Sequence, residues 1–258
     1  MTDDPVTYER RGPVAVVTID RPGRKNAVDA ATADALADAR ERFADGDADV
    51  MVLTGAGGDF SAGADLKAFD LADRPEGYLG LTRTRVEKPT VAAVEGHCVA
   101  GGLELALWCD VRVAAEGATF GCLERRFGVP LVDGGTQRLP RVVGLGRALD
   151  MIVTGEPIDA ATAEEWGLVT RLVEEGAALD AAVELGERVA SYPQTTLRSD
   201  LAATYDGLGE PLATGLELEA DHGAAVLDTA AEGAARFAGG EGRGGDWSFG
   251  SDADDGDA

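Results

Sequence analysis

Lysine, histidine and cysteine are scarce in this sequence of 258 residues. Only Lys25, Lys67 and Lys88 are lysines, and the other basic residues are all arginines. Aspartate and glutamate together number 47 against 23 lysines and arginines, which gives a net charge of −24. Because no basic cluster is available to neutralise phosphates, the sequence argues against nonspecific nucleic-acid binding.

The excess of acidic residues has two interpretations. It could form an acidic surface for a basic partner, or the surface of a halophilic protein, in which concentrated salt screens the repulsion among carboxylates. The acidic residues are spread along the chain, and lysine is scarce throughout. Since dispersed charge is usually a solvated surface, we favour the halophilic interpretation.

The three cysteines, Cys98, Cys109 and Cys122, are an odd number and form no CxxC motif. They indicate reduced thiols, which are typical of cytoplasmic proteins. The first residues, MTDDPVTYERRG, are acidic and polar, unlike a targeting peptide. No apolar run reaches the roughly eighteen residues of a membrane span. We therefore expect a cytoplasmic protein that does not enter a membrane.

The first part of the chain alternates short strand and helix patterns. VTYERRG and PVAVVTID, separated by Gly12-Pro13, predict a β-hairpin. AATADALADARERFAD has the apolar spacing of a helix, and VMVLT and TVAAVEG have the composition of buried strands. A glycine-rich loop after VMVLT predicts a helix start near Ala64-Asp65, followed by a polar connection at 70–88. This order predicts an α/β fold.

The last third of the chain has a different pattern. After about Val173 it is predicted to be helical up to about Ala238, and the final stretch is rich in glycine and aspartate, which predicts disorder. We expect a core at 1–190, a helical region at 191–238 and an acidic tail at 239–258.

Several motifs that could carry chemistry are weak. GAGG at 55–58 lacks the third glycine of a dinucleotide loop, because Phe60 stands there. Ser61 in DFSAG lacks the first glycine of a GxSxG nucleophile motif. His97 and His222 are the only histidines, and each is more simply a packed or surface imidazole than a catalytic or metal-binding group. We therefore expect neither a Ser-His-Asp triad nor a metal site.

Two segments of small residues are more informative, SAGAD at 61–65 and AGGLE at 100–104. Small side chains allow a backbone to approach a ligand closely, and the first N–H groups of a helix have no internal partner. N–H groups from both segments could converge on one oxygen as an oxyanion hole. Both segments could equally be tight turns that pack a helix on a strand, and the residues alone leave the two open.

Two glutamates lie near apolar residues. Glu104 stands alone in the run VAGGLELALWCD, where an uncompensated charge would cost several kcal/mol. Glu124 follows twenty residues later in FGCLERRFGVP. Instead of a catalytic group, Glu124 could be an ordinary surface residue in an ion pair with Arg125 or Arg126.

Five motifs in this order resemble the crotonase superfamily, the enoyl-CoA hydratase/isomerase family. They are IDRPGRKNAVD, VLTGAGGDFSAGADLKAF, KPTVAAVEGHCVAGGLELALWCDVRVAAEGATFG, GGTQRLPRVVG and VTGEPIDAATAEEWGLV. The resemblance extends from about Val6 to Phe237. It implies a spiral of ββα units followed by a C-terminal helical trimerisation region, an acyl-CoA substrate with no further cofactor, and a trimer or a dimer of trimers.

The resemblance also implies which residues form the site. The oxyanion-hole amides would be those of Ala64 and Gly101, and the catalytic carboxylates those of Glu104 and Glu124. The residues implied in binding the CoA thioester are Arg24, Lys25, Ala62, Asp65, Leu66 and Lys67.

Because hydratases of this family carry both glutamates, the resemblance implies an enoyl-CoA hydratase acting in fatty-acid β-oxidation. It would add water across the 2,3 double bond of a trans-2-enoyl-CoA. An isomerase or acyl-CoA hydrolase that uses one glutamate, and a non-catalytic acyl-CoA-binding protein, are the alternatives. Two residues depart from the family pattern: Leu123 replaces the usual proline before the second glutamate, and Ala100 replaces a frequent glycine.

Overall fold

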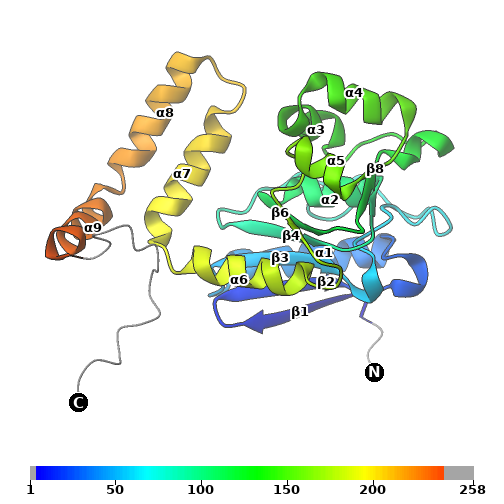
Figure 1. The fold of residues 1–258 in the computed structure, drawn as a ribbon, viewed down its shortest axis with the longest axis horizontal. Helices are drawn as coiled ribbons and strands as arrows, with labels where there is room; N and C mark the ends of the chain where they lie inside the picture. Colours follow the sequence, from blue (N-terminus) through cyan, green and yellow to red (C-terminus); the bar gives the residue numbers. More distant parts are fainter. Residues whose placement is uncertain (1–3, 241–258) are drawn as a thin grey trace. The chain divides into compact units, whose positions relative to one another are not determined.

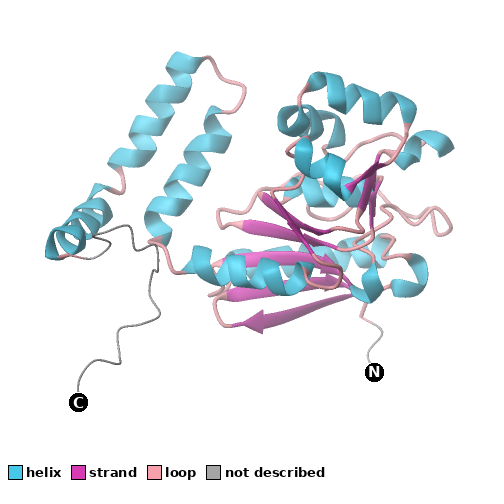
Figure 2. Cartoon of the chain, viewed as in Figure 1, coloured by secondary structure: helices cyan, strands magenta, loops and turns pink. Residues whose placement is uncertain are grey.

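The computed structural model describes residues 4–240, which form two compact units, one that ends at Gly186 and one that begins at Glu187 (Figure 1). Among the described residues, every strand lies in the first unit (Figure 2). The α/β fold predicted from the sequence is confirmed. The part of the predicted acidic tail at 241–258 lies outside the described residues.

A six-stranded sheet forms the centre of the first unit, in the order β1-β2-β3-β4-β6-β9. Its strands are β1 (Val6–Arg11), β2 (Val14–Ile19), β3 (Val50–Gly55), β4 (Thr90–Val94), β6 (Val111–Ala115) and β9 (Arg171–Val173). β1 and β2 are antiparallel, which confirms the predicted hairpin, and the other pairs are parallel. The continuous apolar runs of β2, β3 and β4 are buried, as expected for the interior of a parallel sheet.

A smaller sheet in the first unit is attached to the glycine-rich loop that follows β3. It contains β5 (His97–Val99), β7 (Thr119–Gly121) and β8 (Ile158–Asp159), in the order β5-β7-β8. A bridge between Ser61 and Cys98 attaches the glycine-rich loop after β3 to β5. β5 leads directly into the helix α2 (Gly101–Trp108), so this loop and the start of α2 are held side by side.

Helices surround these sheets in the first unit. They are α1 (Ala30–Asp45), α3 (Gly135–Val143), α4 (Leu145–Thr154), α5 (Ala160–Glu165) and the first part of α6 (Ala178–Ala190), with short 3-10 helices η1 (Pro22–Arg24), η2 (Ala56–Gly58) and η3 (Leu123–Phe127). Asp29 caps α1 by accepting a hydrogen bond from the Thr32 N–H at 3.0 Å. Leu36 and Phe43 on one face of α1 are fully buried in the core.

The helix start predicted near Ala64-Asp65 is wrong. The segment forms a single turn, closed by a hydrogen bond from the Phe69 N–H to the Asp65 carbonyl at 2.8 Å. Phe69 has a φ of 46°, which a continuing right-handed helix does not allow. The Asp65 carboxylate accepts hydrogen bonds from the N–H groups of Lys67 and Ala68. Capping of this turn by its own side chain gives the backbone a local alternative to a helix.

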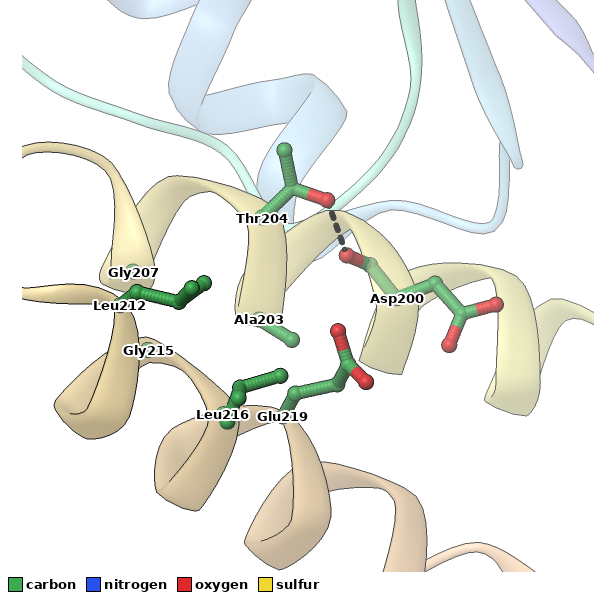
Figure 3. A pocket seen from close by; sticks show the side chains of 8 residues that line it. All are labelled: Asp200, Ala203, Thr204, Gly207, Leu212, Gly215, Leu216 and Glu219. Atoms are coloured by element: carbon green, nitrogen blue, oxygen red, sulfur yellow. Dashed lines mark hydrogen bonds between the residues drawn. The ribbon is translucent and has the colours of Figure 1, made fainter.

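From Glu187 on, the described chain is helical, as predicted. It contains the end of α6, then α7 (Gln194–Gly207), α8 (Leu212–Ala224) and α9 (Leu227–Gly239). α7 and α8 lie side by side, with a pocket of about 300 Å³ between them (Figure 3). Several large apolar side chains on these helices, or directly after α7, are exposed: Leu208, Leu212, Leu216, Leu227 and Phe237.

Candidate active site

The glycine-rich loop and the start of α2 approach each other so closely that glycine is required. A Cβ on Gly63 would lie 2.4 Å from the Gly101 nitrogen, and one on Gly101 would lie 3.4 Å from the Ala64 nitrogen. A Cβ on Gly102 would lie 2.1 Å from the Ser61 carbonyl oxygen. Because real Cβ atoms do not approach this closely, the glycines at 63 and 102 allow the two backbones to meet. The residues alone left open whether these two segments form an oxyanion hole or tight turns, and the structure brings the two segments together.

Ala64 and Gly101 also line one cavity of about 390 Å³ in the first unit. Among the turn and loop hydrogen bonds of the described residues, neither of their N–H groups donates to a backbone carbonyl. Ser61 stabilises the loop, since its hydroxyl donates to the Asn26 carbonyl at 2.8 Å and accepts from the Gly63 N–H at 3.1 Å. Because Ser61 is fully buried and its hydroxyl is used in these two hydrogen bonds, Ser61 is a structural residue of the turn.

Glu104 lies on α2 with its carboxylate against the same cavity. Its side chain is buried, and Oε1 accepts hydrogen bonds from the N–H groups of Asp133 at 2.9 Å and Gly135 at 2.8 Å. Burial raises the pKa of Glu104 to about 7; the charges of Asp133 and Glu124 add to the increase, and the two N–H donors oppose it. The stranded carboxylate is therefore partly compensated by two backbone donors, and both of its protonation states exist near neutral pH.

Glu124 lies in η3 and lines the same cavity. It is buried, and neither of its carboxylate oxygens has a hydrogen-bond partner among the described residues. Burial is the main cause that raises its pKa. Arg125 and Arg126 do not form hydrogen bonds or ion pairs with it in the described chain; they donate instead to the carbonyls of Ile152 and Gly155. The surface ion pair considered for Glu124 from the sequence is therefore wrong.

The residues predicted to bind the CoA thioester divide into two groups. Ala62, Asp65 and Leu66 line the cavity, whereas Arg24, Lys25 and Lys67 do not. Burial raises the pKa of Asp65, but hydrogen bonds from the N–H groups of Lys67 and Ala68 and the charge of Arg21 outweigh it and lower that pKa. The Asp65 carboxylate thus forms hydrogen bonds within its own turn and an ion pair with Arg21 at 3.2 Å.

Lys25 lies outside the cavity with its ammonium bound to the Asp59 carboxylate at 2.9 Å and 3.1 Å from His97 Nδ1. Lys25 is half exposed, so its charge faces solvent beside the glycine-rich loop. In residues 4–240, no three His, Cys, Asp or Glu side chains are grouped so that they could hold a metal ion.

The rest of the cavity wall is largely apolar, and the residues of it that are named next were not identified individually from the sequence. The connection at 70–88 contributes Leu71, Tyr78 and Leu79. Phe69 and Phe127 are strongly exposed side chains that also line the cavity. Asp133 was not identified either; the only signal for it is a single acid between the apolar run VPLV and the following glycine pair.

Comparisons with known proteins agree with this fold. A family described as enoyl-CoA hydratase/isomerase matches residues 9–248. A probable enoyl-CoA hydratase of Rhizobium meliloti is 38% identical over 226 residues, 85% of this chain and 88% of its own length. A carnitinyl-CoA dehydratase of Salmonella agona is 38% identical over 189 residues, 70% of this chain and 72% of its own. The crystal structure of enoyl-CoA hydratase EchA1 from Mycobacterium marinum is 37% identical, with a TM-score of 0.87 over 92% of this chain and 96% of its own.

This chain belongs to the enoyl-CoA hydratase/isomerase family, and its fold is the crotonase fold. In residues 4–240, no helix is both long enough and apolar enough to cross a membrane.

Proposed function

We propose that the protein is an enoyl-CoA hydratase that adds water across the 2,3 double bond of a trans-2-enoyl-CoA. The observation that carries this proposal is the presence of two buried carboxylates, Glu104 and Glu124, on one cavity that Ala64 and Gly101 also line. Hydration needs a group that removes a proton from water and a group that supplies one to carbon. An isomerase or a hydrolase of the same family needs only one carboxylate.

The reaction begins with the thioester oxygen bound by the N–H groups of Ala64 and Gly101. These donors stabilise the negative charge that develops on this oxygen as the water oxygen bonds to C3. One glutamate takes the proton that the water loses. The other delivers a proton to C2, so that the thioester oxygen loses its negative charge and the 3-hydroxyacyl-CoA is formed. Burial raises the pKa of both glutamates, and that of Glu104 to about 7, so the carboxyl group of Glu104 can hold a proton near neutral pH.

The apolar wall of the cavity supports an acyl chain without charged substituents. Leu71, Leu79 and Phe127 line the same cavity as Glu104 and Glu124. Arg24, Lys25 and Lys67 lie outside this space, where they are proposed to bind the phosphates of CoA at the surface. CoA enters as part of the substrate, and the proposed reaction uses no other cofactor.

The test is the loss of absorbance of the conjugated enoyl thioester, with crotonyl-CoA and longer 2-enoyl-CoA substrates in concentrated KCl. Glu104→Gln and Glu124→Gln are each expected to lower kcat by at least about 100-fold, because each removes one proton-transfer group. Glu116→Gln, which changes an exposed glutamate, is the matched control. Wild-type turnover in Glu104→Gln would refute the proposal. Conversion of 3-enoyl-CoA without hydration would identify an isomerase, release of free CoA a hydrolase, and tight binding without turnover a non-catalytic protein.

The proposal extends to the setting of the enzyme. Exposed apolar side chains on α8 and α9, such as Leu212, Leu227 and Phe237, support a homo-oligomer, a trimer or a dimer of trimers. The net charge of −24 supports a halophilic cytoplasmic enzyme of fatty-acid β-oxidation. Light scattering in molar KCl tests the assembly, and a monomer at micromolar concentration would contradict it.

A further inference from the structure

Asp133 is a buried carboxylate that the proposed reaction does not use. Its backbone N–H donates to Glu104 Oε1 at 2.9 Å, in the segment that also contributes the second donor, the N–H of Gly135. Its side chain is only 2% exposed. Burial of a charged group is costly unless the group is bound, so the contacts of this carboxylate decide what it does.

The carboxylate of Asp133 is bound by the connection at 70–88. Oδ1 accepts a hydrogen bond from the Thr82 hydroxyl and another, at 3.3 Å, from the Leu79 N–H. The backbone folds tightly around it: Gly77 has a φ of 97°, and a Cβ there would lie 2.5 Å from Asp133 Oδ1. Hydrogen bonds of this kind to a charged acceptor are among the stronger ones in proteins.

Arg138 completes the connection between the two segments. Its guanidinium donates to the Asp133 carbonyl at 3.0 Å and to the Thr82 carbonyl at 2.5 Å. Asp133 is therefore held at its side chain and at its carbonyl, while its N–H points to Glu104. This leaves the N–H little freedom to move relative to the wall of the cavity, which Leu79 also lines.

We propose, on the basis of the proposed hydratase function, that Asp133 is a positioning residue for Glu104. Its carboxylate, bound by Thr82 and Leu79, fixes the pair of N–H donors that hold Glu104 Oε1. It thereby couples the wall of the acyl cavity to the carboxylate that transfers a proton. Asp133 itself is not a proton-transfer group in this role.

The electrostatics of the site are consistent with such a role. Burial is the main cause of the raised pKa of Glu104, and the negative charge of Asp133 raises this pKa further. The charge of Glu124 also raises the pKa of Glu104. The charges of both glutamates raise the pKa of the nearby Cys122 thiol. The charge of Asp133 also acts on Arg83.

The experiment compares Asp133→Ala with Asp133→Asn. Asparagine keeps an oxygen that accepts from Thr82 and Leu79 but has no charge, whereas alanine removes the anchor. Asp73→Asn is the matched control, because Asp73 is an exposed acid of the same connection and forms its ion pair with Arg83. Each variant is assayed for kcat and KM, and Glu104 is titrated in the absence of substrate by ¹³C NMR of carboxyl-labelled glutamate, with Glu104→Gln to assign the signal.

Asp133→Ala is expected to lower kcat about 100-fold with KM changed less than threefold, because misplacement of a reacting group by about 1 Å can cost this much. Asp133→Asn is expected to have a kcat at least tenfold above that of Asp133→Ala. In Asp133→Asn the pKa of Glu104 is expected to fall by about half a unit or more, since the neighbouring charge is removed while the donors remain. Asp73→Asn should change neither quantity.

Three results would overturn the proposal. They are a kcat within threefold of wild type in Asp133→Ala, an equal loss in the alanine and asparagine variants, and an unchanged Glu104 titration in Asp133→Asn. If the wild type hydrates no enoyl thioester, the proposed function fails, but the NMR titration still decides whether Asp133 controls Glu104. The two failures are therefore distinguishable.

Discussion

Replacement of Glu104 by glutamine should stabilise the protein at alkaline pH while it lowers activity. In the folded state burial raises the pKa of Glu104 from 4.5 to about 7, so the folded protein holds this proton more tightly than the unfolded chain does. As pH rises from about 4.5 to about 7, the unfolded chain loses this proton while the folded protein retains it, so the unfolded state becomes more favourable. At about 1.4 kcal/mol per pKa unit, the stability lost across this window is about 3 kcal/mol.

Glutamine has no proton to lose and can still accept from the N–H groups of Asp133 and Gly135. The free energy of unfolding of Glu104→Gln relative to wild type should therefore increase by roughly 2.5 kcal/mol between about pH 5 and about pH 8.5, by linkage. This difference between two pH values cancels any constant effect of the substitution, and also the pH dependence that the many other carboxylates share.

The measurement is urea-induced unfolding of both proteins at one protein concentration and one high salt concentration, at each pH. Glu116→Gln, an exposed position, should show no such change between the two pH values. A pH-dependent difference below about 1 kcal/mol, or one of opposite sign, would refute the conclusion that burial dominates at Glu104.

Three further substitutions test the packing around the site. Gly135→Ala should lower kcat about tenfold, because the new Cβ would lie 3.1 Å from Glu104 Oε1; unchanged hydration would show that the carboxylate is not held where the structure has it. Ala100→Gly should raise the melting temperature by about 2–4 °C in calorimetry, because Ala100 has φ 53° and ψ −127°, a strained backbone conformation for alanine. A lower melting temperature would mean that the greater loss of entropy of glycine on folding outweighs this strain. Lys88→Met should cost about 2 kcal/mol in urea unfolding without changing kcat, because the buried ammonium donates to two carbonyls at the end of α1; equal stability would contradict this role.

The sequence predicted those parts of the site that depend on local pattern. The run AGGLE places two glycines before an apolar helix, so the open N–H of Gly101 and the position of Glu104 in the first turn of α2 follow from neighbouring residues. The hairpin of β1 and β2 and the helices after Val173 are also local features. The helix predicted at Ala64-Asp65 failed because the Asp65 side chain caps a turn, a competition that helical spacing does not reveal.

The remaining parts of the site depend on contacts between distant residues. The donors to Glu104 lie 29 and 31 residues away along the chain, and the anchor of Asp133 lies about 50 residues before it. Whether Glu124 pairs with the following arginines depends on where α4 ends, since Arg125 and Arg126 donate to the carbonyls at that end. Spacing in the sequence contains no signal for any of these contacts.

Opposing effects act on Glu104, and the structure shows which is larger. The start of α2 and two N–H donors favour the charged carboxylate. Burial, with the nearby charges of Asp133 and Glu124, favours the neutral acid, and its effect is greater because the pKa rises to about 7. A carboxyl group with this pKa can donate or accept a proton at neutral pH, which an ordinary glutamate does poorly. The stability that the fold loses at Glu104 as pH rises to about 7 is thus the direct consequence of the raised pKa that suits this residue to proton transfer. Glu104→Gln should recover this stability and abolish the proton transfer.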